Sequence, residues 1–227
     1  MYRNHLKRLI DIPLSATGIA ILAIPMAIIA IIVKADSKGP ILFWQKRVGK
    51  GKATFMMPKY RTMYTDTPAE TPTHMLSQPD KWITKSGRIL RKTSLDELPQ
   101  IWCILTGKMS IIGPRPALWN QYDLIEERDK YGANDIRPGL TGWAQVNGRD
   151  EIEIADKARL DGEYVRNMSF KMDWLCFWMT FASVLKSKGV VEGGTGVMAN
   201  QKQRIENDVD AVTVNTSNGS TAHNRVA

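Results

Sequence analysis

The hydrophobic pattern of the chain begins with a long uncharged run at residues 12–33. About 20 apolar residues in a helix are enough to cover the hydrocarbon core of a bilayer. Pro25 interrupts the run, and a proline inside a helix removes a backbone hydrogen bond and causes a bend. The run is too long for the apolar core of a signal peptide, which has roughly 7–15 residues. The pattern therefore predicts an uncleaved, bent helix in contact with lipid.

Positive charge flanks this run on both sides, at Arg3, Lys7 and Arg8 before it and at Lys34 and Lys38 after it. Lysine and arginine beside a membrane segment favour the cytoplasmic side. Basic residues at both ends therefore fit a re-entrant helix, which enters the bilayer, bends and returns, as well as they fit a helix that crosses.

Two short apolar runs, at residues 41–44 and 53–57, flank a basic turn that contains glycine. Such a pattern predicts a β-hairpin. Residues 64–82 are rich in threonine, proline and aspartate and show no period, which predicts a surface loop. From residue 193 onward, glycine and then small polar residues dominate, and this composition predicts a disordered tail.

Apolar residues at three- and four-residue spacings predict helices in most of the remaining chain. The predicted helical segments are 83–105, 119–131, 152–167 and 173–186, whereas the glycine-bearing segment 137–149 is predicted to be a loop. The last helical segment is aromatic and nearly free of charge. It fits either a buried core helix or a helix at the membrane interface, where tryptophan is favoured. Together these elements predict a mostly helical α+β protein with interfacial amphipathic helices.

Composition narrows the function classes. The 227 residues include 43 % hydrophobic ones, which is ordinary for a globular protein and excludes a multi-spanning transporter. The net charge of +8 arises from residues 1–199 and suits an anionic lipid surface, an anionic substrate or a nucleic acid. The three histidines are scattered, and the two cysteines form no metal-binding pair, so a zinc site is not expected. Any metal would be a hard ion with oxygen ligands.

The adjacent carboxylates of Asp96 and Glu97 are the first candidates for chemistry. Ser94-x-x-Glu97 has the spacing of a capping box, in which both side chains satisfy backbone N–H groups at a helix N-terminus. Pro99 instead favours a helix that starts near position 99, because proline prefers the first helical position. In that second arrangement both carboxylates are free from capping, and the residue pattern alone favours neither arrangement.

Basic residues surround this acidic pair in the sequence. Arg88 precedes it closely, Lys59 belongs to an earlier basic cluster, and prolines brace Arg115 and Arg137 in two loops. The planar guanidinium of arginine matches phosphate oxygens, and a braced arginine loses less entropy on binding. Magnesium commonly takes one or two carboxylates together with substrate phosphates. The pattern indicates a magnesium-dependent phosphate site.

Several motifs occur in the order typical of one bacterial enzyme family. They are Lys7-Arg8 with Asp11, Gly39-Pro40, Gln45-x-Arg47-x-Gly49, Lys59-x-Arg61-Thr62-Met63, Ser94-Leu95-Asp96-Glu97-Leu98-Pro99-Gln100, Met109-Ser110-x-x-Gly113-Pro114-Arg115-Pro116 and Arg137-Pro138-Gly139-x-Thr141-Gly142-Trp143-x-Gln145-Val146-Asn147-Gly148-Arg149. On these motifs, which cover about residues 3–190, the chain resembles bacterial sugar transferases. These are the small monotopic polyprenyl-phosphate phosphoglycosyl transferases that begin exopolysaccharide, capsule or glycan assembly.

The resemblance implies transfer of a sugar-1-phosphate from a UDP-sugar to undecaprenyl phosphate, with release of UMP. By motif position, it implies that Asp96 is the nucleophile of a covalent phosphosugar intermediate and a ligand of Mg²⁺, and that Glu97 is the acid/base. The remaining site residues are Lys59, Arg88 and Arg115 for phosphate contacts, and Arg137, Thr141, Gln145 and Arg149 for recognition of the nucleotide or sugar.

The resemblance also implies a domain organisation and a location. Residues 1–38 would form the re-entrant membrane helix with its flanks, 39–192 the catalytic domain facing the cytoplasm at the bacterial inner membrane, and 193–227 the tail. Many members of the family have Ser-Pro at the break in this helix, where this chain has Ile24-Pro25. The expected partners are a UDP-sugar, undecaprenyl phosphate, membrane lipid and other glycan-assembly enzymes, without nucleic acid.

The main alternative is a non-catalytic, membrane-attached binder of acidic polymer or nucleic acid, which the net charge of +8 would suit. The adjacent carboxylates Asp96 and Glu97 argue against it, because they would repel a phosphate backbone unless a metal intervenes.

Overall fold

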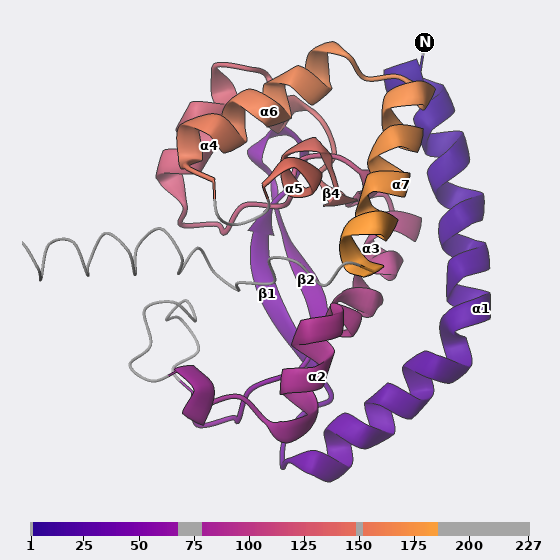
Figure 1. Cartoon of the computed structure of the whole chain (residues 1–227), viewed down its shortest axis with the longest axis vertical. Coiled ribbons are helices and arrows are strands. Elements are labelled where there is room, and N and C mark those ends of the chain that lie inside the picture. The colour runs from indigo at the N-terminus through magenta and orange to yellow at the C-terminus, as the bar shows by residue number, and fades with distance from the viewer. Residues whose placement is uncertain (1, 68–78, 149–151, 186–227) are drawn as a thin grey trace, which may run out of the picture.

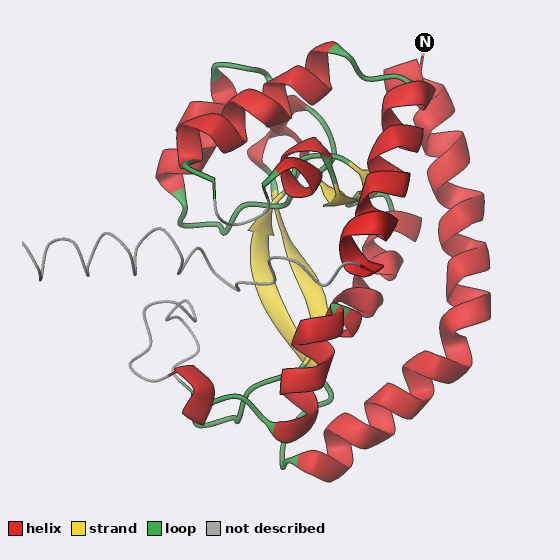
Figure 2. Cartoon of the chain, viewed as in Figure 1, coloured by secondary structure: helices red, strands yellow, loops and turns green. Residues whose placement is uncertain are grey.

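The computed structural model describes residues 2–67, 79–148 and 152–185. The described part is mostly helical and contains two small two-stranded sheets, as Figures 1 and 2 show. The predicted class, α+β and mostly helical, is confirmed. The predicted tail at 193–227 and most of the predicted loop at 64–82 lie outside the described residues.

A long bent helix, α1 (Lys7–Asp36), runs along one side of the molecule (Figure 1). A π-turn at Tyr2–Leu6 precedes it, and both Pro13 and Pro25 lie inside it. Within the described chain it is the one helix long and apolar enough to cross a membrane, with a mean hydropathy of 2.7 over its most apolar stretch. Only 11 % of that stretch is buried against the rest of the protein. Most of its apolar surface is therefore exposed.

The start of α1 is bound to the folded domain. Lys7 forms an ion pair with Asp173, and the carboxylate of Asp11 accepts a hydrogen bond from the backbone N–H of Ile111 at 3.1 Å. The guanidinium of Arg8 donates to two backbone carbonyl oxygens, those of Ile104 and Leu105, at 2.5 and 2.7 Å.

The end of α1 is bound to the same domain. The carboxylate of Asp36 accepts hydrogen bonds from both the backbone N–H and the hydroxyl of Ser86, each at 2.8 Å. The hydroxyl of Tyr60 donates to the Met26 carbonyl at 2.7 Å, and Ile29 and Val33 are buried against Tyr60 and Leu90. The helix is thus attached to one body at both of its ends.

Strands β1 (Leu42–Val48) and β2 (Thr54–Tyr60) form the predicted antiparallel hairpin, with Leu42 opposite Tyr60. Its turn is a 3-10 segment, η2 (Lys50–Lys52), in which Gly51 has a φ of +64°. Strand β2 shares a buried apolar cluster, Met57 with Cys103 and Ile104, with the helix α3 (Ile101–Leu105). This packing places the segment before α3 against the hairpin.

The segment predicted as one helix over 83–105 is divided into three pieces. They are α2 (Lys85–Thr93), the 3-10 helix η5 (Leu95–Gln100) and α3. Ser94 adopts a left-handed conformation with a φ of +57°, which ends α2 and turns the chain. The prediction of a continuous helix was therefore wrong. The spacing of apolar residues is not changed by a single residue in the left-handed conformation, so it cannot reveal this break.

The segment 137–149, predicted as a loop, contains regular structure. The short strands β3 (Ser110–Ile112) and β4 (Gly139–Thr141) pair in parallel, and α5 (Trp143–Asn147) follows β4. A Cβ added to Gly139 would lie 2.1 Å from the nitrogen of Gly113, so glycine here allows the close approach of two backbones. Strands of three residues are too short to show an alternating pattern, which explains the wrong prediction.

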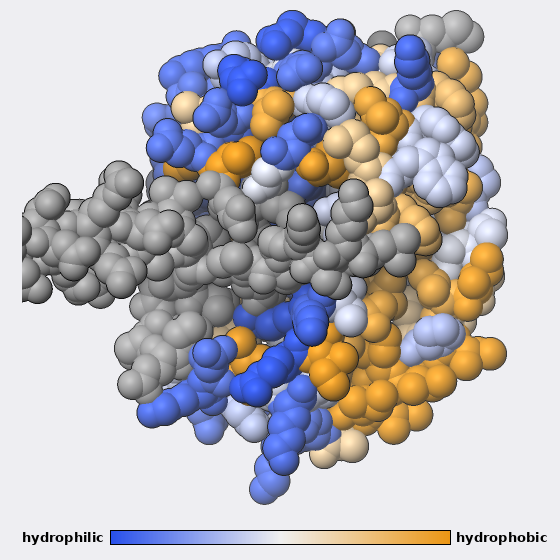
Figure 3. All heavy atoms as spheres, in the orientation of Figure 1, coloured by the Kyte–Doolittle hydropathy of each residue, from blue (hydrophilic) through white to orange (hydrophobic). Residues whose placement is uncertain are grey.

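The helices α4 (Tyr122–Asp129), α6 (Ile154–Arg166) and α7 (Phe170–Leu185) confirm the other three helical predictions with shifted ends. Along α7, exposed aromatic side chains contact one another in sequence, some stacked and some edge to face; they are Phe170, Trp174, Phe177, Trp178 and Phe181. The core-helix alternative is wrong for this face. Figure 3 shows hydrophobic residues gathered on the side of the molecule where α1 lies, with hydrophilic ones on the opposite side.

Candidate active site

The left-handed turn at Ser94 determines the position of the acidic pair. Asp96 and Glu97 lie in the first turn of η5, and Asp96 is only 4 % exposed. The side chain of Ser94 caps nothing, and the N–H of Glu97 donates instead to the backbone oxygen of Ser94 at 3.2 Å. The helix after Pro99 begins at Ile101. The capping-box arrangement is thus not formed, and the Glu97 carboxylate is available for contacts across the site.

Glu97 lies between two basic side chains from distant parts of the chain. The Lys59 ammonium, at the end of β2, lies 3.0 Å from Glu97 Oε1. Arg115 donates two hydrogen bonds to the two Glu97 oxygens, at 2.5 and 3.2 Å. Such a two-pronged contact fixes the plane of both groups. The structure therefore brings together three of the residues that the sequence predicted for this site, beside the nucleophile candidate Asp96.

The environment of Glu97 sets its charge. Burial by itself raises the pKa of the carboxyl, but Arg115 and Lys59 outweigh it and hold the pKa well below the ordinary value. Glu97 is therefore ionised at neutral pH. The side chains of Lys59, Glu97 and Arg115 remain 15, 16 and 33 % exposed, so an anionic ligand can reach the cations.

The loop that carries Arg115 is held by residues to which the sequence assigned no role. Arg128 donates to the backbone oxygen of Arg115 at 2.9 Å and forms a buried ion pair with Asp161 at 2.6 Å. Arg47 donates to the carbonyl of Pro116, also at 2.9 Å. Arg128 and Asp161 lie on two different helices, α4 and α6, and no local sequence pattern connects them.

Gln100 is another residue to which the sequence assigned no role, although it stands in the same motif as the acidic pair. It is 2 % exposed, in the same short helix η5 as Asp96. Its Nε2 amide has no hydrogen-bond partner in the described part of the chain. Buried donors are normally paired, so this amide is available to a bound ligand.

The other predicted residues are spread more widely. Arg88 is exposed on α2. Thr141 shares a hydrogen bond with Thr180 of α7 at 2.7 Å, and Gln145 donates to the Leu140 carbonyl at 3.2 Å. Arg149 lies outside the described residues.

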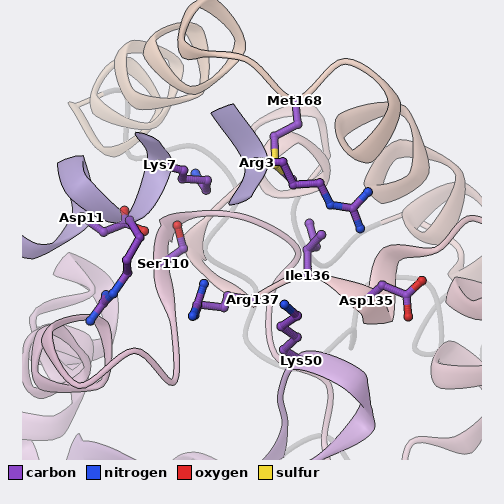
Figure 4. A pocket seen from close by; sticks show the side chains of 10 residues that line it. Arg3, Lys7, Asp11, Lys50, Ser110, Asp135, Ile136, Arg137 and Met168 are labelled. Carbon is purple, nitrogen blue, oxygen red and sulfur yellow. The ribbon is translucent and has the colours of Figure 1, made fainter. Parts of the chain in front are cut away.

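Thr141 and Gln145 nevertheless adjoin the loop of Arg115. A Cβ added to Gly142 would lie 2.0 Å from the Gly113 oxygen and 3.4 Å from Gln145 Oε1. Arg137 lies at the other end of β4, next to Ser110, and lines a separate cavity (Figure 4). Of the four residues predicted to recognise the nucleotide or sugar, two thus lie next to the Arg115 loop and one faces elsewhere.

The donor set of the site is suited to a magnesium ion completed by substrate. Within the described residues, no group of three or more histidine, cysteine, aspartate or glutamate side chains could hold a metal alone. Asp96 and Glu97 offer adjacent oxygen ligands, and Mg²⁺ accepts one or two carboxylates when phosphate oxygens and water supply the rest. An all-protein cage is not needed for such an ion.

Comparison with known proteins establishes the class to which the chain belongs. The sequence profile of the bacterial sugar transferases matches residues 2–187. The chain belongs to the bacterial sugar transferase family, which places it among enzymes and confirms the resemblance found in its motifs.

Individual relatives agree with this assignment. The chain is 36 % identical over 192 residues to an undecaprenyl-phosphate glucose phosphotransferase of Komagataeibacter xylinus, with 80 % of this chain and 36 % of that protein covered. It is 35 % identical over 185 residues to the uncharacterized sugar transferase EpsL of Bacillus subtilis, with 82 and 90 % covered. A UDP-N-acetylgalactosamine-undecaprenyl-phosphate N-acetylgalactosaminephosphotransferase of Aeromonas hydrophila is 32 % identical over 192 residues, with 81 and 44 % covered. The chain thus spans less than half of two of these relatives and most of the third.

Proposed function

We propose that this protein transfers a sugar-1-phosphate from a UDP-sugar to undecaprenyl phosphate at a membrane surface and releases UMP. The observation that carries the proposal is the buried Asp96 next to Glu97, which is held between Lys59 and Arg115. The exposed apolar surface of α1 would bind the protein to the membrane that holds the lipid acceptor. Relatives named for undecaprenyl-phosphate sugar transfer support the same reaction.

The first step is attack by a carboxylate oxygen of Asp96 on the phosphorus that carries the sugar. A new P–O bond to Asp96 forms, the P–O bond to UMP breaks, and UMP leaves as an anion. The covalent intermediate divides one difficult transfer into two easier ones. Lys59 and Arg115 stabilise the negative charge that develops on the phosphoryl oxygens, and Mg²⁺ bound by Asp96 and the diphosphate would add Lewis-acid stabilisation.

The second step returns Asp96 to its carboxylate form. An oxygen of undecaprenyl phosphate attacks the same phosphorus, the bond to Asp96 breaks, and Glu97 takes the proton of the incoming monophosphate. Donor phosphates compete with Glu97 for Arg115 and Lys59. Loss of those contacts removes the two positive charges that hold the Glu97 pKa below its ordinary value, which favours proton uptake by Glu97.

The attachment of both ends of α1 to one domain supports a re-entrant helix over a crossing one. Arg8 and Asp36 lie at opposite ends of α1, and both contact the body that carries Asp96. A helix that crossed the bilayer would place these two contacts on opposite sides of the membrane. With the re-entrant arrangement, both ends and the active site face the cytoplasm at the inner membrane, where UDP-sugars are present.

The reaction is tested by measuring UMP release from purified protein in detergent with undecaprenyl phosphate, Mg²⁺ and a panel of UDP-hexoses and UDP-N-acetylhexosamines. Asp96→Asn is expected to abolish both UMP release and the phosphosugar adduct detected by mass spectrometry. The matched control is Asp156→Asn, which removes a carboxylate exposed on α6. A phosphosugar adduct on the Asp96→Asn protein would overturn the nucleophile assignment. If none of the UDP-sugars in the panel gave UMP release, the proposed reaction would be overturned.

The topology is tested with single cysteines introduced at His5 and at Lys38, in a Cys103→Ala/Cys176→Ala background. Both positions flank α1 and are exposed. A membrane-impermeant thiol reagent should label neither cysteine in intact cells and both after lysis. Labelling of one position alone in intact cells would show a crossing helix.

A further inference from the structure

A cavity of about 200 Å³ lies at the start of α1, and five basic side chains line it. Arg3, Lys7 and Arg8 come from the π-turn and first turn of α1, Lys50 from the hairpin turn, and Arg137 from the segment before β4 (Figure 4). Two carboxylates, Asp11 and Asp135, also line it. The lining therefore carries an excess of three positive charges.

Two of the charged side chains that line the cavity already have partners within the protein. Lys7 is paired with Asp173, and Asp11 accepts the N–H of Ile111. The side chains of Arg3 and Lys50 make no hydrogen bond or ion pair with any residue in the described ranges 2–67, 79–148 and 152–185. A concave site with unneutralised cations concentrates positive potential and favours anions.

Two arginines of the cavity are held in place by the end of α3 and the turn that follows it. Arg8 donates to the carbonyls of Ile104 and Leu105, and Arg137 donates through Nε to the carbonyl of Gly107 at 2.8 Å. Carbonyl groups at the end of a helix are unpaired within it, so they are natural partners for cations. The terminal nitrogens of Arg137 make no hydrogen bond within the described part, which leaves its fork available to a ligand.

A buried hydroxyl points to the same ligand. Ser110 lines the cavity, is 1 % exposed, and its Oγ has no hydrogen-bond partner among the described residues. Buried polar atoms are normally satisfied, and a hydroxyl can donate to an anion as well as accept from a cation. The hydroxyl, the arginine fork and the two cations are all donor groups that phosphate oxygens accept.

The cavity is distinct from the Asp96–Glu97 site. Lys50 precedes β2 and Lys59 lies near its end, and a strand of this length spans about 20 Å at roughly 3.4 Å per residue. Ser110 and Arg115 are likewise separated along β3 and the loop that follows it. A single phosphate group therefore cannot contact both sites.

We propose that this cavity is a second phosphate-binding site, in which Arg3, Lys50, Arg137 and Ser110 bind the phosphate group of a soluble anion or of a lipid headgroup. Lipid is within reach, because Leu6 and Leu9 beside these basic residues and Phe170 beside the lining residue Met168 are exposed. The proposal does not depend on the transfer reaction proposed above.

The test uses the full chain in detergent micelles and the double variant Arg3→Gln/Lys50→Gln. Neither side chain has a hydrogen-bond or ion-pair partner among the described residues, so the variant should keep the unfolding midpoint of the wild type. Isothermal titration with inorganic phosphate at constant ionic strength is expected to show a class of site whose affinity falls roughly tenfold or more in this variant, since two charge-assisted contacts are lost. Arg115→Gln should leave that class unchanged.

A matched control removes two positive charges that do not line the cavity, by Lys52→Gln/Arg166→Gln. A second variant, Ser110→Ala, removes the unpaired hydroxyl and is expected to weaken phosphate binding severalfold without lowering the unfolding midpoint. Equal phosphate affinity in the wild type and in both cavity variants would overturn a soluble phosphate ligand.

Native mass spectrometry distinguishes the lipid source. Added phosphatidylglycerol is expected to give adducts that the Arg3→Gln/Lys50→Gln variant loses and the control variant keeps, whereas diacylglycerol with the same acyl chains gives none. If the Arg3→Gln/Lys50→Gln variant lost the phosphatidylglycerol adducts but bound inorganic phosphate as the wild type does, the cavity would be assigned to lipid headgroups. If neither phosphate nor phosphatidylglycerol distinguishes the variant from the control, the proposal is wrong.

Discussion

The buried ion pair between Arg128 and Asp161 provides a sharp test of how the active site is held. Asp161→Asn leaves the Arg128 guanidinium, 3 % exposed, without its counter-charge. Breaking one partner of a buried pair costs about 3–5 kcal/mol. For a domain of this size, each kcal/mol lowers the unfolding midpoint by roughly 2–4 °C, so we expect a decrease of roughly 6–20 °C.

The same variant should also lose activity, because Arg128 holds the backbone oxygen of Arg115 and Arg115 holds Glu97. Thermal unfolding in micelles and UMP release at a temperature well below both midpoints measure the two effects separately. Displacement of a reacting group by about 1 Å can cost roughly 100-fold in rate. We expect kcat to decrease by roughly 10- to 100-fold.

The double variant Arg128→Met/Asp161→Leu separates stability from positioning. Replacing both charges of a buried pair with apolar groups of similar volume is often neutral for stability. The midpoint should therefore return to within a few degrees of the wild type, while UMP release stays low because Arg115 still lacks its donor. A midpoint change below about 2 °C in Asp161→Asn would refute the argument from burial. Full activity in the stable double variant would refute the positioning role of Arg128.

Three further predictions address charge, metal and lipid contact. Because cations hold the Glu97 pKa below its ordinary value, the ionic contribution of Glu97 to folding is complete at pH 7 and begins to be lost below about pH 4.3. The difference in unfolding midpoint between the wild type and Glu97→Gln should therefore narrow as the pH falls from 5 to 3. A difference that stays constant over this range would contradict the prediction. Removal of divalent ions with a chelator should reduce UMP release at least 100-fold and added Mg²⁺ should restore it, whereas unchanged turnover would argue against the metal. In bilayers with brominated lipid, Trp174→Phe/Trp178→Phe should remove a large part of the tryptophan quenching, because the two α7 indoles are half-exposed. Trp82→Phe should leave this quenching intact, because Trp82 is not part of α7 and is less exposed.

The sequence predicted those parts of the fold that have a strong local signal. The hairpin, the three helices α4, α6 and α7 and the long apolar helix each have a regular apolar period or length. The strands β3 and β4 were missed because their pairing depends on the contact of two glycines, Gly113 and Gly139, that are far apart in sequence. The break at Ser94 was missed because one left-handed residue leaves no mark on the apolar spacing.

The site was predictable where a motif carries its own chemistry. Charge and motif order assigned Glu97, Lys59 and Arg115 to one site, with the two cations as phosphate contacts, but did not predict that both would pair with Glu97. The support from Arg128 was not predicted either, because it depends on the packing of α4 against α6. The position of Arg137 was also not predictable, since the predicted loop between it and Thr141 contains a strand, and Arg137 lines a cavity before the start of that strand.

The closed attachment of α1 has a consequence for how the protein meets bilayers of different thickness. A free helix accommodates a thicker or thinner membrane by tilting. Here the contacts of Arg8 and Asp36 fix both ends at a set separation, so the helix cannot tilt independently of the domain. In the proposed re-entrant arrangement, the depth of the bend and the height of Asp96 above the acyl chains would therefore be constant, and the surrounding lipid, rather than the protein, would deform.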